Sequence, residues 1–92
     1  MPKDLVFITV IGKDQKGIIA RISNAVFMHN INIEDLNQKV MDGYFVMTML
    51  ADMTDSSASI GDIKKEFAEI EKQMDLNIQV QHENIFKAMH RV

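Results

Sequence analysis

The chain contains no cysteine. This absence excludes disulfide bonds, thiolate metal sites and a cysteine nucleophile. The chain also lacks any apolar run near the roughly 18 residues that a membrane-spanning helix requires. Its first ten residues, MPKDLVFITV, include an acidic residue and show no signal-peptide cleavage pattern. We therefore expect a cytoplasmic protein that does not enter a membrane.

Clusters of basic residues are missing as well. The ten lysines and arginines are scattered, and thirteen acidic residues bring the formal net charge to −3. A nucleic-acid-binding surface needs grouped Lys and Arg side chains that neutralise phosphates, so we expect no nucleic-acid partner. The four glycines, at positions 12, 17, 43 and 61, are too dispersed to form a phosphate-binding loop.

Side chains that could carry catalysis are few. The chain has three histidines, namely His29, His82 and His90. No two of them have the i, i+4 spacing of helical metal ligands, and no acidic cluster accompanies them. A structural role explains His29, because it can interact with the last carbonyl groups of a predicted helix. We expect no metal site, no cofactor and no catalytic residue, and therefore a protein that is not an enzyme.

The length of 92 residues is enough for one small domain, which we expect to cover residues 1–92 with a helical tail at 83–92. Leu5 to Ile11 is apolar at both parities, a pattern typical of a central strand. The stretch from about Gly17 to His29 repeats apolar residues at i, i+4 and is predicted to be a helix. Asn30 is a suitable terminator, because it tolerates left-handed geometry.

The next segment is predicted to be a β-hairpin. Ile31 to Met41 alternates as a strand does, but its apolar parity changes near Glu34-Asp35. A strand with period 2 changes parity only at a bulge or a break, so we place one there. Asp42-Gly43 suits a type I′ turn, because both central positions of that turn need positive φ. Tyr44 to Asp52 follows as a second two-sided strand.

The last third of the chain is predicted to form a helix, a strand and a short terminal helix. Ile60 to Met74 spaces apolar residues by three and four, and Ser59 with Asp62 matches a helix cap. Leu76 to Gln81 alternates apolar and polar residues, so this strand has one wet face. In the tail we expect a helix over Glu83 to His90 that docks through an apolar side formed by Ile85, Phe86 and Met89.

These elements predict an α+β fold. The order βαββαβ gives a ferredoxin-like sandwich, a four-stranded antiparallel sheet with two helices on one face, plus the short C-terminal helix. The other face of the sheet would then be bare and partly apolar. Exposed patches of this kind are normally covered, so we expect the C-terminal helix, a second subunit or both to lie there, and we expect a homodimer.

The stretch VFITVIGKDQKGIIARI is the most informative part of the chain. A polar loop, Lys13 to Lys16, separates a buried strand from a helix that begins at Gly17. Glycine allows a sharp turn or a close approach by another group. The free N–H groups of a helix N-terminus favour an anion such as a small carboxylate. The alternative is an ordinary strand-to-helix turn, in which Asp14 and Asn32 serve only as turn formers.

The segment GKDQKGIIARIS resembles the first strand, loop and helix of ACT domains. The likeness continues through HNINIEDLNQ, the DGYFVMTM hairpin and the amphipathic second helix, so it covers nearly the whole chain. The chain looks most similar to free-standing proteins with a single ACT domain. Many family members carry proline just before the loop glycine, whereas Lys16 stands there in this chain and could offer charge to a ligand carboxylate.

The resemblance implies a regulatory module that binds a small molecule, commonly an amino acid, at a subunit interface. Asp14 would accept a hydrogen bond from the ammonium group, the N–H groups at the start of the helix would bind the carboxylate, and Asn30 or Asn32 would bridge from a neighbouring strand end or a second subunit. The predicted ligand-binding residues are Asp14, Gln15, Lys16, Gly17, Ile18, Ile19, Asn30 and Asn32.

Two functions follow from these observations. The first is an amino-acid-binding regulatory module that acts in trans on a partner enzyme or regulator, because the chain has no catalytic domain of its own. The second is a structural dimerisation or protein-interaction domain that binds no ligand.

Overall fold

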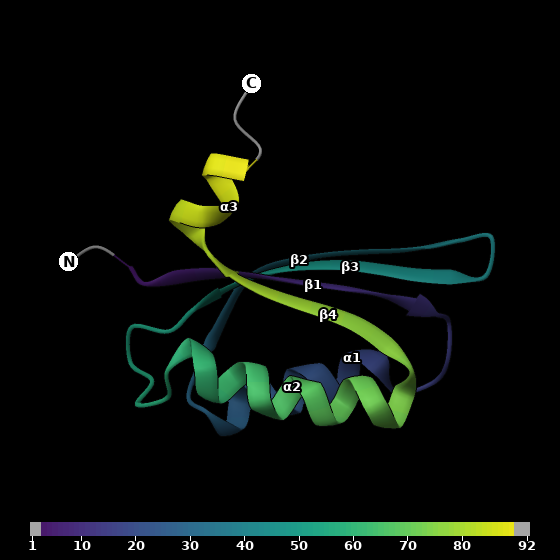
Figure 1. The fold of residues 1–92 in the computed structure, drawn as a ribbon, viewed down its shortest axis with the longest axis horizontal. Helices are drawn as coiled ribbons and strands as arrows, with labels where there is room; N and C mark the ends of the chain where they lie inside the picture. Colours follow the sequence, from purple (N-terminus) through teal and green to yellow (C-terminus); the bar gives the residue numbers. More distant parts are fainter. Residues whose placement is uncertain (1–2, 90–92) are drawn as a thin grey trace.

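The computed structural model describes residues 3–89. Four strands and three helices follow one another along this part of the chain (Figure 1). They are β1 (Leu5–Lys13), α1 (Ile18–Met28), β2 (Asn32–Met41), β3 (Tyr44–Asp52), α2 (Ile60–Met74), β4 (Leu76–His82) and α3 (Glu83–Met89). Strand β1 is two residues longer than the sequence predicted, so Lys13 ends the strand and the loop begins at Asp14.

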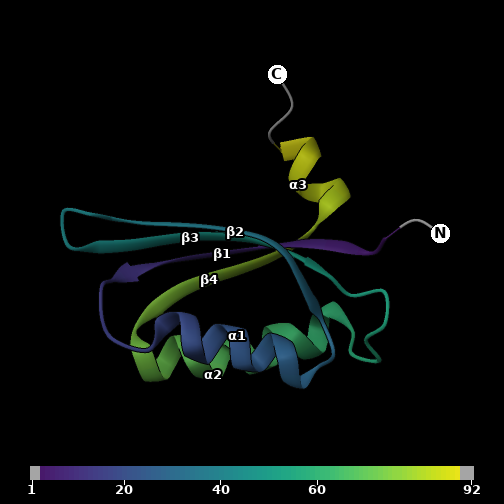
Figure 2. The same ribbon diagram turned by 180° about the vertical axis from the view of Figure 1, so that it is seen from behind.

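The four strands form one antiparallel sheet in the order β2-β3-β1-β4. Helices α1 and α2 cover one face, and α3 stands on the other face near one end (Figures 1 and 2). This arrangement confirms the predicted ferredoxin-like sandwich with a short C-terminal helix. It also explains why β1 is apolar at both parities, because this strand has a neighbour on each side and groups above and below it.

The core lies between the sheet and the helices α1 and α2. Strand β1 contributes alternate side chains to it, and β3 contributes the residues that pair with them. The buried residues of these two strands are Val6, Ile8, Val10, Phe45, Met47, Met49 and Ala51. The helices close the core with single apolar rows, whose buried members include Ile22, Val26, Ile63, Phe67 and Ile70. Among residues 3–89, no helix has the length and apolar content that crossing a membrane requires.

The predicted backbone irregularities are present. The pairing of β2 with β3 shifts between Ile33 and Asp35, which confirms the bulge inferred from the change of parity. Asp42 and Gly43 have φ values of 52° and 83°, as a type I′ turn requires. Asn30 follows α1 with φ of 56°, the left-handed conformation expected of a helix terminator.

Helix α2 begins with the predicted cap. The Ser59 hydroxyl accepts a hydrogen bond from the Asp62 backbone N–H at 3.1 Å, and the Asp62 carboxylate accepts one from the Ser59 N–H at 2.9 Å. The hydrogen bond from the Ser59 backbone, more than any other contact, holds the pKa of the Asp62 carboxyl below its usual value. Because the pKa is lowered on folding, the ionised carboxylate stabilises the folded state.

This cap gives a pH-dependent prediction. The stabilisation is fully present above the unfolded-state pKa, about 3.9, and is lost as the pH falls through the lower folded-state pKa. Asp62→Ala should therefore lower the urea midpoint at pH 7, and the difference from wild type should shrink below about pH 4. Glu69→Ala, at an exposed position of the same helix, is the control. A difference that persists unchanged at pH 3 would contradict the assignment.

Helix α3 docks on the sheet through two of the three residues predicted for it, Phe86 and Met89. The Phe86 ring stacks on the Phe7 ring, with centroids 4.0 Å apart and an interplanar angle of 18°. Ile85 and Met89, expected to pack with Phe86, are 56% and 63% exposed. Met89 still contacts the sheet, because its Sδ atom accepts a hydrogen bond from the Gln81 side-chain amide at 3.1 Å. Phe86 therefore ties α3 to β1, and Met89 ties it to β4. His90, expected at its end, lies outside the described residues.

His29 also differs from the prediction. Its Nε2 atom lies 2.6 Å from the Glu66 carboxylate, so the ring joins α1 to α2 instead of interacting with the last carbonyl groups of α1. One of those carbonyls, at Val26, accepts backbone N–H groups of the following turn. The imidazole is therefore free to reach across to the neighbouring helix.

Candidate functional site

The loop between β1 and α1 is held from two sides. The Asp14 backbone N–H donates to the Gly43 carbonyl at 2.9 Å, which ties the loop to the turn between β2 and β3. The Gln15 side-chain amide donates to the Met74 carbonyl at 2.7 Å, which ties the loop to the end of α2. Gln15 was predicted to contact a ligand, and in this structure its amide N–H is used to anchor the loop.

Gly17 sets the start of α1. Its φ of 89° lies in the left-handed region that favours glycine, and no side chain caps the helix. The first intrahelical hydrogen bond runs from the Arg21 N–H to the Gly17 carbonyl at 2.9 Å. The N–H groups ahead of Arg21 therefore have no partner within the helix, and the partial positive charge at this end favours an anion.

A cleft of about 320 Å³ opens at this helix end. It is lined by Asp14, Gln15, Gly17, Ile18, Ile19, Ala20, Gln38, Val40 and Phe45. The structure thus brings five of the predicted site residues together and adds Gln38, Val40 and Phe45 from the hairpin. Sequence reasoning missed these three, although the parity of β2 after its bulge and the turn at Asp42-Gly43 indicate that Val40 and Phe45 are paired on the helix-covered face.

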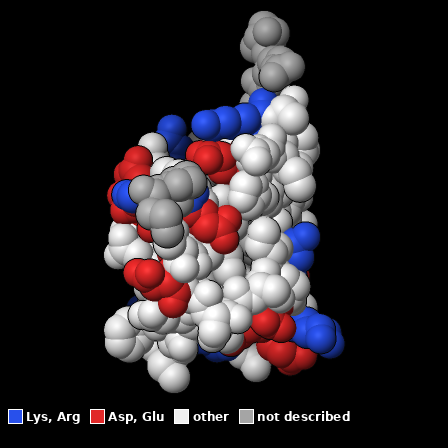
Figure 3. All heavy atoms as spheres, turned by 90° about the vertical axis from the view of Figure 1, so that its left-hand side faces the viewer, with Lys and Arg blue, Asp and Glu red and all other residues white. Residues whose placement is uncertain are grey.

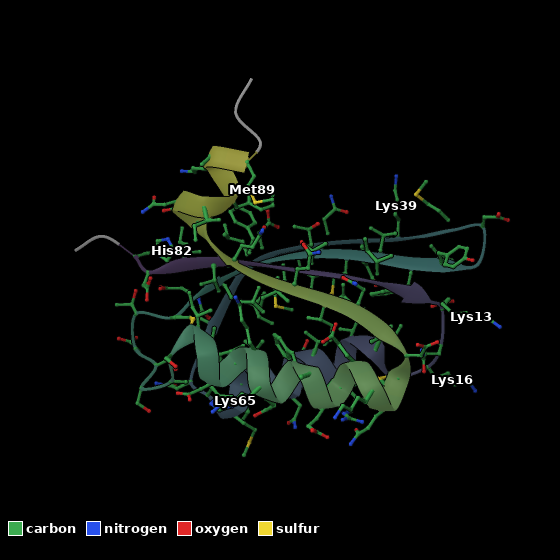
Figure 4. All side chains as sticks on the ribbon, viewed as in Figure 1. Lys13, Lys16, Lys39, Lys65, His82 and Met89 are labelled. Carbon is green, nitrogen blue, oxygen red and sulfur yellow. The ribbon has the colours of Figure 1, made fainter. Side chains whose placement is uncertain are left out.

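The electrostatics of the cleft combine both signs of charge. The Asp14 carboxylate has no hydrogen-bond or ion-pair partner among residues 3–89. It stands beside the uncapped, partially positive end of α1. Lys16 does not line the cleft, and Figure 4 shows Lys13 and Lys16 extending outward from the loop. The contact between Lys16 and a ligand carboxylate stays a prediction, and it would require the lysine side chain to turn toward the cleft.

Asn30 and Asn32 lie at the other end of the sheet. Asn32 pairs with Asp52, the last residue of β3, whereas Asp14 bonds just ahead of the first residue of β3. The two ends of this nine-residue strand are about 27 Å apart. In one chain, Asn30 and Asn32 cannot contact a small molecule bound at Asp14. Their predicted role as ligand contacts requires a second copy of the chain.

The side chains of both asparagines already have partners. Asn30 donates to the Asp55 carbonyl at 3.0 Å, and Asn32 donates to the Glu34 carboxylate at 3.1 Å. Acidic side chains gather at this end of the molecule, and Figure 3 shows several of them facing the viewer. A ligand carboxylate would be repelled there, so the loop end of the sheet is the better carboxylate site.

Two other hollows are larger than the loop cleft. One, of about 370 Å³, lies on the face of the sheet away from α1 and α2, and the other, of about 470 Å³, lies beside β4. Neither combines a helix N-terminus with a carboxylate. Within the described range, no three His, Asp or Glu side chains gather closely enough to hold a metal ion.

Comparison with known proteins agrees with the observed fold. A family model for the ACT domain matches residues 4–81. A UPF0237 protein of Clostridium perfringens is 46% identical over 85 residues, which are 92% of this chain and 96% of that protein. The solved structure of an ACT domain protein from Streptococcus pneumoniae is 31% identical with a TM-score of 0.80, and the match covers 97% of this chain and 100% of that one.

A more distant likeness concerns the fold alone. A formyltetrahydrofolate deformylase from Pseudomonas syringae is 17% identical with a TM-score of 0.82, and the match covers 89% of this chain and 28% of that enzyme. The whole-chain matches are the ones that decide the family. The chain belongs to the ACT domain family.

Proposed function

We propose that this protein binds a free amino acid, or a similar small zwitterion, in the cleft at the start of α1 and acts in trans on a partner enzyme or regulator. ACT domains are regulatory domains that bind small molecules. The observation that supports the ligand class is the uncapped N-terminus of α1 beside the unpaired Asp14 carboxylate. An amino acid carries the complementary pair of charges on neighbouring atoms.

Each part of the ligand has a counterpart in the cleft. The ligand carboxylate accepts hydrogen bonds from the N–H groups of Ile18 and Ile19. Its ammonium group donates to Asp14, a charge-assisted hydrogen bond. The apolar side chains of Val40 and Phe45 and the amide of Gln38 form the opposite wall, which faces the ligand side chain. In this proposal a homodimer supplies Asn30 or Asn32 only if two copies meet along the β2 edge.

A thermal-shift screen of the common amino acids tests the ligand class. A ligand present at 100 times its Kd should add about 2.7 kcal/mol to the free energy of unfolding. For an amino acid that raises the melting temperature, Asp14→Asn should weaken the affinity in calorimetry about 10- to 100-fold, because a charged hydrogen bond contributes about 1.5–3 kcal/mol.

The matched control for that variant is Glu69→Gln, which removes one negative charge at an exposed position of α2. It should leave the affinity unchanged, because an exposed charge outside the cleft is screened by solvent. No response to any amino acid would reject the ligand class. Equal affinity in Asp14→Asn and wild type would reject the site while leaving the ligand class standing.

The second candidate function is an interaction domain without a ligand. The observation in its favour is the sheet face opposite α1 and α2, where Ile11, Tyr44 and Met41 are about half exposed. A protein with this function would dimerise or hold a partner, and its stability would not respond to amino acids. The same thermal-shift screen therefore separates the two candidates.

A further inference from the structure

The face of the sheet away from α1 and α2, called the open face below, carries a regular pattern. Helix α3 contacts only β1 and β4 there, so the described residues leave β2 and β3 uncovered. Figures 1 and 2 show α3 at one end of this face and the β2–β3 hairpin reaching out at the other. The hollow on this face is lined by Phe7, Asp35, Asn37, Lys39, Val46, Thr48 and Leu50.

A polar row crosses the middle of the open face. Residues that pair directly across neighbouring strands point to the same face, so the register defines rows perpendicular to the strands. Asn37 pairs with Thr48, Thr48 with Thr9, and Thr9 with Gln79. The middle row is therefore Asn37, Thr48, Thr9 and Gln79, with one polar residue from each strand.

The rows on either side of the middle row match each other. The row nearer α3 consists of Asp35, Leu50, Phe7 and Gln81. The row nearer the hairpin consists of Lys39, Val46, Ile11 and Asn77. In both rows β3 and β1 supply apolar side chains and β4 supplies an amide. Only β2 differs, with an acid in one row and a base in the other.

This pattern is complementary to itself. A two-fold axis along the middle row reverses the strand direction and places each flanking row of one copy over the opposite flanking row of the other. Leu50 of each copy then meets Val46 of the other, and Asp35 meets Lys39. Phe7 and Gln81 already contact Phe86 and Met89 of α3, so on the β1 and β4 half of the face α3 itself meets Ile11 and Asn77 of the other copy. An isologous interface requires such a self-complementary patch.

Neither Asp35 nor Lys39 has an ion-pair partner among residues 3–89 of its own chain. Asp35 and Lys39 are four residues apart on β2, about 13 Å along the strand. Among residues 3–89, the Asp35 carboxylate accepts only from the adjacent Leu36 N–H, at 2.9 Å, and Lys39 has no ion pair. Complementary charges at an interface set its register and disfavour wrong partners.

More than half of the exposed large apolar side chains of the described residues lie on the open face or on α3. Within residues 3–89, nine large apolar residues are exposed, and five of them lie on the open face or on α3. These five are Ile11, Met41, Tyr44, Ile85 and Met89. Because the axis reverses the strands, α3 of each copy is directed toward the hairpin end of the other. The apolar side chains that α3 leaves exposed are then next to those that the hairpin end leaves exposed.

The area of the open face is sufficient for a stable dimer. The four strands, which are seven to ten residues long, span about 19 Å by 30 Å, or about 570 Å² in projection, and α3 adds to this surface. A standard interface buries about 800 Å² of accessible surface on each partner, and the accessible surface of side chains exceeds the projected area.

We propose that the open face is the interface between two copies of this chain, related by a two-fold axis along the row Asn37–Thr48–Thr9–Gln79, with Asp35 of each copy opposite Lys39 of the other. This inference rests on the homodimer expected from the sequence and gives it an interface other than the β2 edge. It leaves the cleft at α1 free, because that cleft lies on the helix-covered side of β2.

Charge reversal tests the interface. Asp35→Lys places two lysines opposite each other at both ends of the interface, and Lys39→Asp places two acids there. Sedimentation velocity over a concentration series should give each variant a dimer Kd raised roughly tenfold or more above wild type.

Mixing the two variants restores the complementarity. One variant carries lysine at both positions and the other carries aspartate at both, so in a heterodimer a lysine meets an aspartate at each end of the interface. Native mass spectrometry of an equimolar mixture should therefore show mostly the heterodimer.

Matched controls on the other side of the molecule are Glu69→Lys and Lys65→Asp, which make the same charge changes on the exposed face of α2. Both should dimerise as wild type does. Far-ultraviolet circular dichroism of all four variants establishes that each is folded.

Several results would overturn the inference. A wild-type monomer at roughly 100-micromolar concentration would reject both this interface and the homodimer, because an interface of standard size binds more tightly than that. A dimer unaffected by Asp35→Lys and Lys39→Asp would place the interface on another surface, such as the β2 edge or a heterologous partner's site. Two dissociating variants that fail to pair in the mixture would reject the two-fold axis. The thermal response to amino acids is read separately, so the ligand proposal stands or falls by itself.

Discussion

Replacing Phe67 by alanine is expected to lower the free energy of unfolding by about 3–5 kcal/mol. Phe67 is only 2% exposed and lies in the apolar row of α2 that packs against the sheet. Its removal forfeits the transfer free energy of the ring and leaves a cavity in a well-packed core. A domain of this size has a total stability of about 5–14 kcal/mol, so the loss is a large fraction. Urea denaturation followed by circular dichroism measures it.

Phe27→Ala is the matched control for this prediction. It makes the same change of residue type on α1, but the Phe27 side chain is 75% exposed. Little apolar surface returns to water there, and alanine has the higher helix propensity. The expected change is within about 0.5 kcal/mol. Similar losses in the two variants would show that burial in the described core is not what makes Phe67 important.

Gly12→Ala is expected to destabilise the protein by about 1–3 kcal/mol. Gly12 pairs with Leu76 where β1 passes the turn from α2 into β4. A Cβ atom at this position would lie 2.5 Å from the Leu76 Cδ2 atom and 3.3 Å from the Asp75 carbonyl oxygen. Leu76 is 7% exposed, so its side chain has little room to move away. Thermal unfolding should show a lower midpoint with the same fold.

The control for this close approach is Gly61→Ala. A Cβ atom there would meet only the Ser59 hydroxyl oxygen, at an ordinary 3.6 Å. Gly61 lies in the first turn of α2, where alanine favours the helix, so the variant should be neutral or more stable by up to about 1 kcal/mol. If Gly12→Ala were also neutral, β1 and the start of β4 would be less closely packed than the structure indicates.

The two proposals concern opposite sides of the sheet. The cleft at α1 lies on the side covered by the helices, and the open face lies on the other. Ligand binding and assembly can therefore be altered one at a time. Strand β2 belongs to both surfaces, because Gln38 and Val40 line the cleft while Asn37 and Lys39 lie on the open face. A change in its position is a direct route by which a bound ligand would affect the dimer.

The sequence by itself determined the elements and their order. The two-sided apolar character of Leu5 to Ile11, the spacing of Ile60 to Met74 and the turn residues Asp42-Gly43 are local signals. The bulge beside Glu34 was also readable, because a strand cannot change parity without one. Each of these depends on neighbours within a few residues, where backbone sterics and periodicity dominate. The loop side of the candidate cleft, Asp14 to Ile19 apart from Lys16, was predicted for the same reason.

Only the tertiary structure decided what lies across from those elements. The hairpin wall of the cleft, the contact of His29 with Glu66 and the separation of Asn32 from Asp14 all depend on how distant segments pair. The contacts of Phe86 with Phe7 and of Met89 with Gln81, which dock α3, have the same origin. Periodicity tells which residues share a face but not which distant residue that face meets. Register and helix packing set those contacts, and they arise when the whole chain closes around one core.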